Sequence, residues 1–122
     1  MLSKNNRADK KAVDQIFKEG RFVNSTNLTL KFINLLQKNT HPRISFIVPK
    51  TVSKKAVVRN LLRRRGYAVL RKYFKQFPSG FLGVFIFNKK GGEVFSGRKN
   101  KNKNPIKELE NEIKLILNKL NY

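Results

Sequence analysis

The hydrophobic pattern of the first half of the chain predicts a short helix followed by strands. In residues 9–19, apolar side chains recur at helical spacing, and Asp9 and Gly20 are suitable residues for the two ends of a helix. Residues 22–36 and 43–49 instead contain alternating apolar and polar positions, as half-buried strands do. The turn-rich sequence QKNTHP separates these two strands, so we expect them to form a hairpin.

The second half predicts a long helix, a buried strand and a final helix. Residues 53–75 are expected to be helical, with Ser53 as the N-cap and an apolar stripe along one side. The stripe consists of Val58, Leu62, Gly66, Val69 and Tyr73. Residues 81–87 are apolar at every position, which is typical of a central strand covered on both faces. The last helix begins with Asn104 as its cap and Pro105 in its first turn.

The order of these elements indicates the fold class. Residues 88–104 are rich in glycine, lysine and asparagine, and we expect them to form a mobile basic loop. The remaining order is helix, strands, long helix, strand and helix. This order predicts an α+β fold, an α/β two-layer sandwich in which three helices pack on a small mixed sheet. Residues 1–122 are expected to form one domain.

Charge indicates the kind of partner. The 122 residues include 28 Lys and Arg but only 7 Asp and Glu, which gives a formal net charge of +21. A compact body with this charge repels itself and is stabilised by a polyanion. Nucleic acid, an anionic membrane surface and an acidic protein are the three candidate partners, and nucleic acid is the one that a basic folded domain usually binds.

Several classes of site and location are disfavoured by the composition. The chain has no cysteine for disulfides or thiolate metal sites, and its one histidine, His41, lies in a predicted turn, where a solvated surface position is expected. We find no nucleophile–base pair, no Walker-type phosphate loop and no set of metal ligands, so we expect neither catalytic residues nor a small-molecule substrate. No apolar run is long enough to span a membrane and the N-terminus lacks a signal sequence, which predicts a cytoplasmic protein without membrane contact.

The long helix carries a broad cationic face beside its apolar stripe. This face contains Arg59, Asn60, Arg63, Arg64, Tyr67 and Arg71. Guanidinium groups donate planar forks of hydrogen bonds that suit phosphates, an asparagine can read a base edge and a tyrosine ring can stack on a base. A merely solvated basic face is the alternative. Ordinary helices intersperse acids among their bases, but residues 43–92 contain no acid, which favours RNA binding.

The first predicted helix offers a second candidate site. Val13 and Phe17 are core residues in the simpler interpretation. In the functional one, Phe17 lines a groove between the helix and the sheet, with Lys50 at its wall. Such an aromatic floor with basic walls would hold a single nucleic acid strand by stacking.

These segments together resemble the protein subunit of bacterial ribonuclease P. The matching parts are a helix ending in F-K-x-G at 17–20, a strand of the pattern R-[IV]-x-[FL]-x-V at 43–48, and the segment at 50–64 that contains K-K-A-V-V-R-N. The resemblance extends from about residue 6 to residue 88. The alternative function is that of a structural RNA-binding protein, such as a ribosomal protein.

The resemblance implies a fold and a division of labour. The fold would contain a rare left-handed β-α-β crossover, against the usual right-handed rule. A large catalytic RNA would hold Mg²⁺ and hydrolyse the 5′ leader from precursor tRNA, and the protein would contribute no catalytic residue. The protein would instead dock on that RNA through its basic helix and hold the single-stranded leader in a central cleft.

The family's functional positions can be placed on this sequence. The expected contacts to the catalytic RNA are Lys54, Lys55, Arg59, Asn60, Arg63 and Arg64, together with Arg65, Tyr67 and Arg71 from the same helix. The expected leader contacts are Val13, Phe17, Lys31, Ile47 and Lys50. Leu61 departs from the family pattern because a basic residue is expected there, and Arg65 is a candidate to supply that charge. Val13 and Lys31 replace family aromatics, so we expect weaker stacking and stronger electrostatics with the leader.

Overall fold

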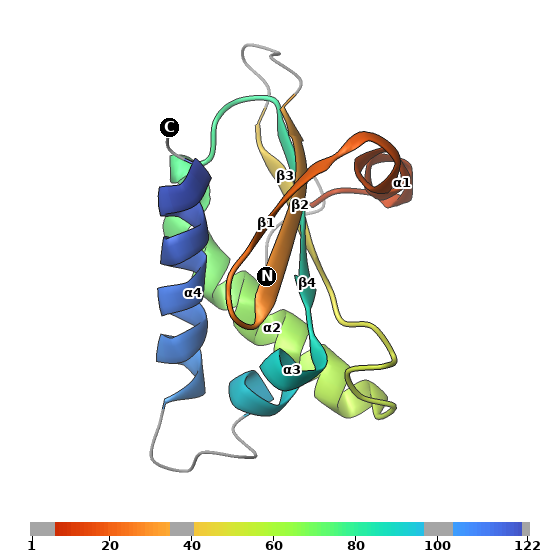
Figure 1. Ribbon diagram of the computed structural model, residues 1–122, viewed down its shortest axis with the longest axis vertical. Coiled ribbons are helices and arrows are strands. Elements are labelled where there is room, and N and C mark those ends of the chain that lie inside the picture. The colour runs from red at the N-terminus through yellow and green to blue at the C-terminus, as the bar shows by residue number, and fades with distance from the viewer. Residues whose placement is uncertain (1–6, 35–40, 97–103, 121–122) are drawn as a thin grey trace.

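A four-stranded sheet separates one helix from three others in the computed structural model, which describes residues 7–34, 41–96 and 104–120 (Figure 1). The elements are α1 (Lys10–Glu19), β1 (Arg21–Asn24), β2 (Leu28–Asn34), β3 (Arg43–Ile47), α2 (Ala56–Tyr73), the short 3₁₀ helix η2 (Phe74–Gln76), β4 (Phe81–Phe87), α3 (Lys89–Ser96) and α4 (Pro105–Leu120). Helix α1 lies on one face of the sheet, and α2, α3 and α4 lie on the other. The predicted α+β class is confirmed, with four α-helices where the sequence predicted three.

The strand order is β1-β2-β4-β3, with β4 in the interior of the sheet. Strand β2 pairs antiparallel with β1 and β4, whereas β3 pairs parallel with β4. The predicted hairpin between residues 22–36 and 43–49 is therefore wrong, because β4 lies between β2 and β3. The hairpin is β1–β2 instead. The apolar sequence of β4 explains its central place, since both of its faces are covered. The β3-α2-β4 segment forms the expected β-α-β crossover, and its left-handedness stays a prediction.

Alternation along the strands divides the apolar residues between two cores. In β2, Leu28, Leu30 and Phe32 are buried on the side of α2 and α4, and Lys31 lies on the α1 side. The larger core contains closely packed rings, among them Phe46 stacked on Phe85 with ring centroids 5.0 Å apart. The smaller core lies under α1 and consists of Ala8, Ala12, Ile16, Leu82 and Val84.

Helix α2 packs on the sheet through the predicted stripe. Its first four members, Val58 to Val69, are buried, and Gly66 allows an especially close approach. A Cβ atom at Gly66 would lie 2.7 Å from the ring of Phe46. The predicted cap is wrong, because Lys55 precedes the first helical residue and Ser53 accepts a hydrogen bond from the Lys55 amide in the preceding turn.

Tyr67 belongs to the larger core and not to the cationic face of α2. Its side chain is only 4% exposed, and its ring meets the Phe46 ring edge-on at 5.1 Å. The Tyr67 hydroxyl accepts a hydrogen bond of 3.2 Å from the backbone amide of Phe46, on the outer strand β3. The expectation that this ring lies exposed among the arginines is therefore wrong, because α2 buries a wider stripe than the sequence pattern indicated.

Helix α3 occupies part of the segment predicted to be a mobile loop. Asn88 caps the helix, since its Oδ1 accepts a hydrogen bond of 2.6 Å from the Gly91 amide, and Phe95 is fully buried. The expectation is wrong for residues 89–96, and residues 97–103 lie outside the described residues.

Helix α4 begins as predicted, with Asn104 Oδ1 accepting from the Ile106 amide at 3.0 Å. One of its acids has an unexpected place. Glu112 is buried, and its carboxylate accepts hydrogen bonds from the Ser25 hydroxyl at 2.6 Å and from the amide and side chain of Asn27, both at 2.7 Å. This carboxylate ties α4 to the turn between β1 and β2.

Candidate functional site

Two surfaces on opposite layers of the molecule contain the predicted site residues. We call the outward side of α2 the α2 surface, and the partly open sheet face beside α1 the α1 cleft. The α2 surface includes the exposed residues Val57, Asn60, Arg64, Arg71 and Lys72. Lys54 and Lys55, just before the helix, are exposed as well. The structure therefore collects most of the predicted RNA-docking residues at one place.

The start of the α2 surface contains one apolar and three polar side chains. Val57, Asn60, Arg63 and Arg64 line an open hollow of about 420 Å³. Arg63 donates a hydrogen bond to the Asn60 side-chain oxygen, which orients the Asn60 amide. Val57 is 77% exposed, and the sequence analysis did not include it because an isolated valine carries no charge signal.

Arg59 holds the segment that leads into α2. Its Nη1 atom donates hydrogen bonds to the carbonyl oxygens of Ser53 and Lys54, each at 2.9 Å. The side chain is half-buried at the edge of the cationic face. Arg59 thus supports the loop that presents Lys54 and Lys55.

Arg65 faces α3 and not the α2 surface. Its Nη1 atom donates a hydrogen bond of 2.6 Å to the carbonyl oxygen of Phe95, in the last turn of α3. A cation is favourable there because helix carbonyls point outward at the C-terminal end. Arg65 therefore has a protein partner on α3, and its contact with RNA and its replacement of the charge missing at Leu61 stay predictions.

The α1 cleft brings together residues from α1, β2 and β3. Val13 and Ile47 both pack against the small core under α1. The ammonium group of Lys31, on β2, lies 4.8 Å from the centre of the Phe17 ring, a cation–π contact between the sheet and α1. Phe17 is 45% exposed, so it is not the buried core residue of the simpler interpretation, and its contact with the leader stays a prediction. Lys50 is exposed, three residues beyond the end of β3.

The floor of the α1 cleft is a row of the sheet that is only partly covered. The strand register places Thr29, Ile86 and Ile47 side by side across β2, β4 and β3. All three are half-buried, whereas Val84 and Ser45 in the adjacent row are buried. Sequence analysis missed Thr29 and Ile86 because strand register, which aligns them with Ile47, cannot be read from alternation alone.

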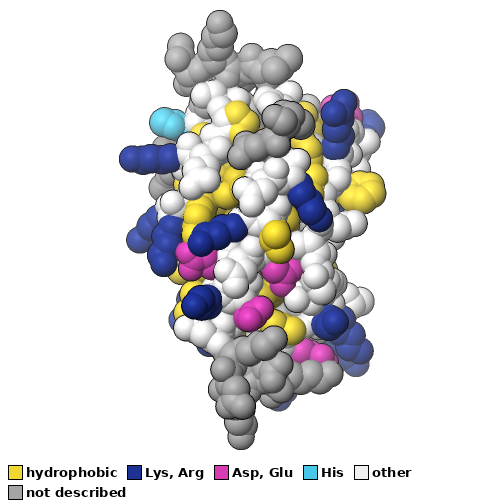
Figure 2. All heavy atoms as spheres, turned by 60° about the vertical axis from the view of Figure 1, so that its left-hand side comes forward, with side chains coloured by type: hydrophobic (Ala, Val, Ile, Leu, Met, Phe, Trp, Pro, Cys, Tyr) yellow, Lys and Arg dark blue, Asp and Glu magenta, His cyan; other side chains and the backbone are white. Residues whose placement is uncertain are grey.

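The acids of α4 distinguish its face from the other two surfaces. Figure 2 brings the α4 side of Figure 1 forward and shows acidic side chains among the basic ones. Glu110 accepts a hydrogen bond from the Tyr73 hydroxyl, and Lys114 lies 3.9 Å from the same carboxylate. The Tyr73 hydroxyl, as a donor, lowers the pKa of Glu110, and the same hydrogen bond raises the pKa of Tyr73. This mixed face lacks the uncompensated positive charge of the α2 surface.

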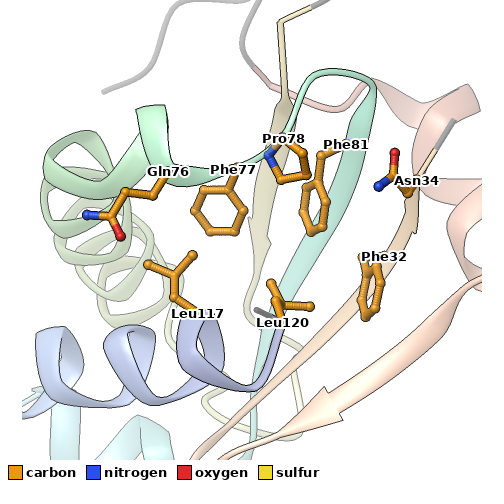
Figure 3. A pocket seen from close by; sticks show the side chains of 8 residues that line it. All are labelled: Phe32, Asn34, Gln76, Phe77, Pro78, Phe81, Leu117 and Leu120. Atoms are coloured by element: carbon orange, nitrogen blue, oxygen red, sulfur yellow. The ribbon is translucent and has the colours of Figure 1, made fainter. Parts of the chain in front are cut away.

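A third hollow has no ionisable side chain in its lining. This hollow of about 420 Å³ opens between the C-terminal end of α4 and the sheet, and Figure 3 shows Phe32, Phe77, Phe81 and Leu117 around it. None of its eight lining residues is ionisable. The described residues bring together no three His, Asp or Glu side chains that would fit Mg²⁺, and none of their helices is long and apolar enough to cross a membrane.

Comparison with known proteins identifies the family. The model of the family described as Ribonuclease P matches residues 2–121. The chain belongs to the ribonuclease P protein family. It is accordingly a protein subunit of ribonuclease P, an endoribonuclease of tRNA processing, which the sequence analysis predicted. Curated protein sequences give no significant match.

Solved structures of ribonuclease P proteins share the fold. The protein from Staphylococcus aureus matches with a TM-score of 0.72 at 18% identity, covering 95% of each chain. The protein from Thermotoga maritima matches with a TM-score of 0.69 at 24% identity, covering 87% of this chain and 89% of that one. At these identities the ribonuclease P fold is shared while most side chains differ, so the site is argued from this chain's own residues.

Proposed function

We propose that this ribonuclease P protein docks on the catalytic RNA through the α2 surface and holds the precursor-tRNA leader in the α1 cleft. The observation that carries the proposal is the separation of the two surfaces by the sheet. One surface is cationic, and the other is a sheet face bordered by the exposed ring of Phe17 and by Lys31. A protein with two such sides can contact two RNA segments at once.

The α2 surface suits a folded RNA. Arg64 and Arg71 are exposed on it, and arginine forks match phosphate oxygens. Each neutralised phosphate releases counterions, so affinity depends steeply on salt. The Asn60 amide, oriented by Arg63, is available to a base edge or a backbone group.

The α1 cleft suits a single strand. A base can stack on the exposed ring of Phe17, and Lys31 beside it can neutralise the adjoining phosphate. The half-buried row of Thr29, Ile86 and Ile47 offers a mostly apolar floor. Mature tRNA lacks a leader, so contacts in this cleft favour the precursor over the product.

The protein's contribution to the reaction is then positional and electrostatic. The catalytic RNA performs the hydrolysis and holds the Mg²⁺ ions, and no protein side chain takes part in bond cleavage. Basic side chains reduce the repulsion between catalytic RNA and substrate RNA, which lowers the Mg²⁺ concentration that cleavage requires. We expect the protein to act in the cytoplasm, where it would meet precursor tRNA.

The test is cleavage of a precursor tRNA by the cognate RNA at low Mg²⁺, with and without the protein. We expect the protein to increase the rate and to tighten binding of the precursor relative to mature tRNA. Arg64→Ala should weaken binding to the catalytic RNA and reduce its salt dependence by about one counterion. Lys107→Ala on α4 is the matched control, because it removes an exposed charge from the mixed face. Rates and affinities unchanged by the protein would refute the proposal.

A further inference from the structure

We infer that Phe22 is a second stacking residue for the leader, which extends the α1 cleft across β1. The inference rests on the proposed function, since it assigns one more residue to the same site. Phe22 lies on the outer strand β1 and is 64% exposed. Nothing in the sequence pattern distinguished it from an ordinary strand phenylalanine.

Strand register places Phe22 on the same face as the cleft. Phe22 is paired with Lys31 in the antiparallel β1–β2 ladder, and directly paired residues project from the same side of a sheet. Its neighbour Val23 projects from the other side and packs against the larger core. Phe22 therefore projects toward the layer that contains α1.

Lys31 consequently lies between two exposed rings. Phe17 contacts the Lys31 ammonium from α1, and Phe22 lies opposite Lys31 on the neighbouring strand. Among the described residues, Phe17 and Phe22 are the only phenylalanines with substantially exposed side chains. The eight other phenylalanines of the described residues are buried or half-buried. Both exposed rings therefore lie on the face of the sheet that forms the α1 cleft.

The spacing of chemical groups suits a single-stranded nucleic acid. Exposed rings stack on bases of any identity, and a lysine between them can neutralise a phosphate of the same strand. Asn24, two residues beyond Phe22 on the same face, adds a hydrogen-bonding group. Its Oδ1 accepts a hydrogen bond of 2.8 Å from the Thr29 hydroxyl, and the exposed side-chain amide can donate to a base or a sugar. An apolar protein partner would instead have to desolvate the Lys31 ammonium.

The experiment uses the reconstituted holoenzyme and measures the affinity for precursor tRNAs with leaders of increasing length. Phe22→Ala should weaken binding about fivefold or more once the leader is long enough to reach β1, with no change for a one-nucleotide leader or mature tRNA. Phe22→Trp should restore the affinity. Leu115→Ala on α4, which removes a side chain that is 52% exposed on the other layer, is the matched control.

A set of leaders with single abasic nucleotides makes the test specific for stacking. At the leader position that stacks on Phe22, removing the base should weaken binding to the wild-type holoenzyme several-fold. The same removal should not weaken binding to the Phe22→Ala holoenzyme any further. A merely structural role would give the same abasic profile for both proteins, and that result would overturn the inference. The inference would also fail if Phe22→Ala changed only the self-association of the free protein in sedimentation.

The outcomes separate this inference from the proposed function. If Phe17→Ala and Lys31→Ala weaken leader-dependent binding while Phe22→Ala does not, the cleft stands and its extension is wrong. If none of the three variants affects leader-dependent binding, the α1 cleft itself is not the leader site.

Discussion

The guanidinium of Arg59 donates a hydrogen bond to the carbonyl oxygen of Ser53 at 2.9 Å, so a side chain of α2 holds the segment that precedes the helix. A second hydrogen bond from the same Nη1 atom reaches Lys54. This helix has no side-chain cap at Lys55, and the two hydrogen bonds of Arg59 instead tie the preceding carbonyl groups to the start of the helix. The exposed Lys54 and Lys55 consequently project from a loop that a side chain of the helix holds in place.

Arg59→Ala should therefore affect both the loop and RNA binding. We expect faster amide hydrogen exchange across residues 50–55 and a loss of about 1–3 kcal/mol in affinity for the catalytic RNA. Arg64→Ala, on the exposed side of α2, should weaken RNA binding while leaving exchange in the loop unchanged. Wild-type exchange in the Arg59→Ala protein would show that this arginine acts on RNA only by direct contact.

Gly66→Ala should destabilise the protein although alanine is the better helix former. The added Cβ would lie 2.7 Å from Phe46, whose ring is held between Tyr67 and Phe85 and has little room to move. We expect overpacking to outweigh the gain in helix propensity, for a net loss of about 1 kcal/mol in the free energy of unfolding. Urea denaturation measures this loss, and Phe46→Leu should relieve it when combined with Gly66→Ala. Independent, additive effects of the two substitutions would contradict this explanation.

Glu112→Gln should loosen the attachment of α4 to the β1–β2 turn. The carboxylate accepts three hydrogen bonds from Ser25 and Asn27, and a glutamine amide would direct a donor group at one of those donors. We expect a loss of about 2 kcal/mol in the free energy of unfolding, measured by thermal or urea denaturation. Glu108→Gln, in the first turn of the same helix, is the control for the change in net charge. Equal stability of the two variants would argue against a structural role for the buried carboxylate.

Stability below neutral pH should depend on Asp9. The Ala12 amide, which donates a hydrogen bond to the Asp9 carboxylate, and Arg43, at 3.1 Å, together hold the pKa of Asp9 below its ordinary value of 3.8. A depressed pKa stabilises the folded state at pH values above 3.8, and that contribution is lost as the pH falls through the lower, folded-state pKa. The difference in unfolding free energy between wild type and Asp9→Asn should therefore be constant near neutral pH and decrease in this acidic range. A difference that does not change with pH would contradict the assignment.

Most helices and strands could be predicted from the sequence, because their periodicity reports directly on burial. The stripe from Val58 to Val69 and the fully apolar β4 are examples. The pairing of the strands could not be predicted, because β4 inserts between β2 and β3 from a distant part of the sequence.

Helix α3 escaped prediction for a related reason. Its two glycines disfavour a helix locally, but both are required by packing. A Cβ atom at Gly91 would lie 2.4 Å from the Asn27 carbonyl oxygen, and one at Gly92 would lie 2.3 Å from Val52. Tertiary contacts thus outweigh helix propensity in this segment.

The candidate site was predicted unevenly. Charged residues of the α2 surface were found because an unbroken run of bases is visible in the sequence. Tyr67 was wrongly expected to be exposed, and the contact of Arg65 with α3 was missed, because their partners, Phe46 and Phe95, lie near them only in the folded chain.

The hydrogen bond between Tyr67 and Phe46 has a consequence for solubility. Strand β3 is an edge strand of the sheet. The unpaired backbone amides of an edge strand can pair with a strand of another molecule, which is a route to aggregation. The Phe46 amide instead donates its hydrogen bond to the Tyr67 hydroxyl, and α2, which carries Tyr67, lies beside this edge of the sheet. The Ser45 hydroxyl donates a hydrogen bond to the Ala8 carbonyl oxygen, which holds the segment before α1 against the same strand. Tyr67, which was expected to bind RNA, thus makes it harder for a strand of another molecule to pair with β3.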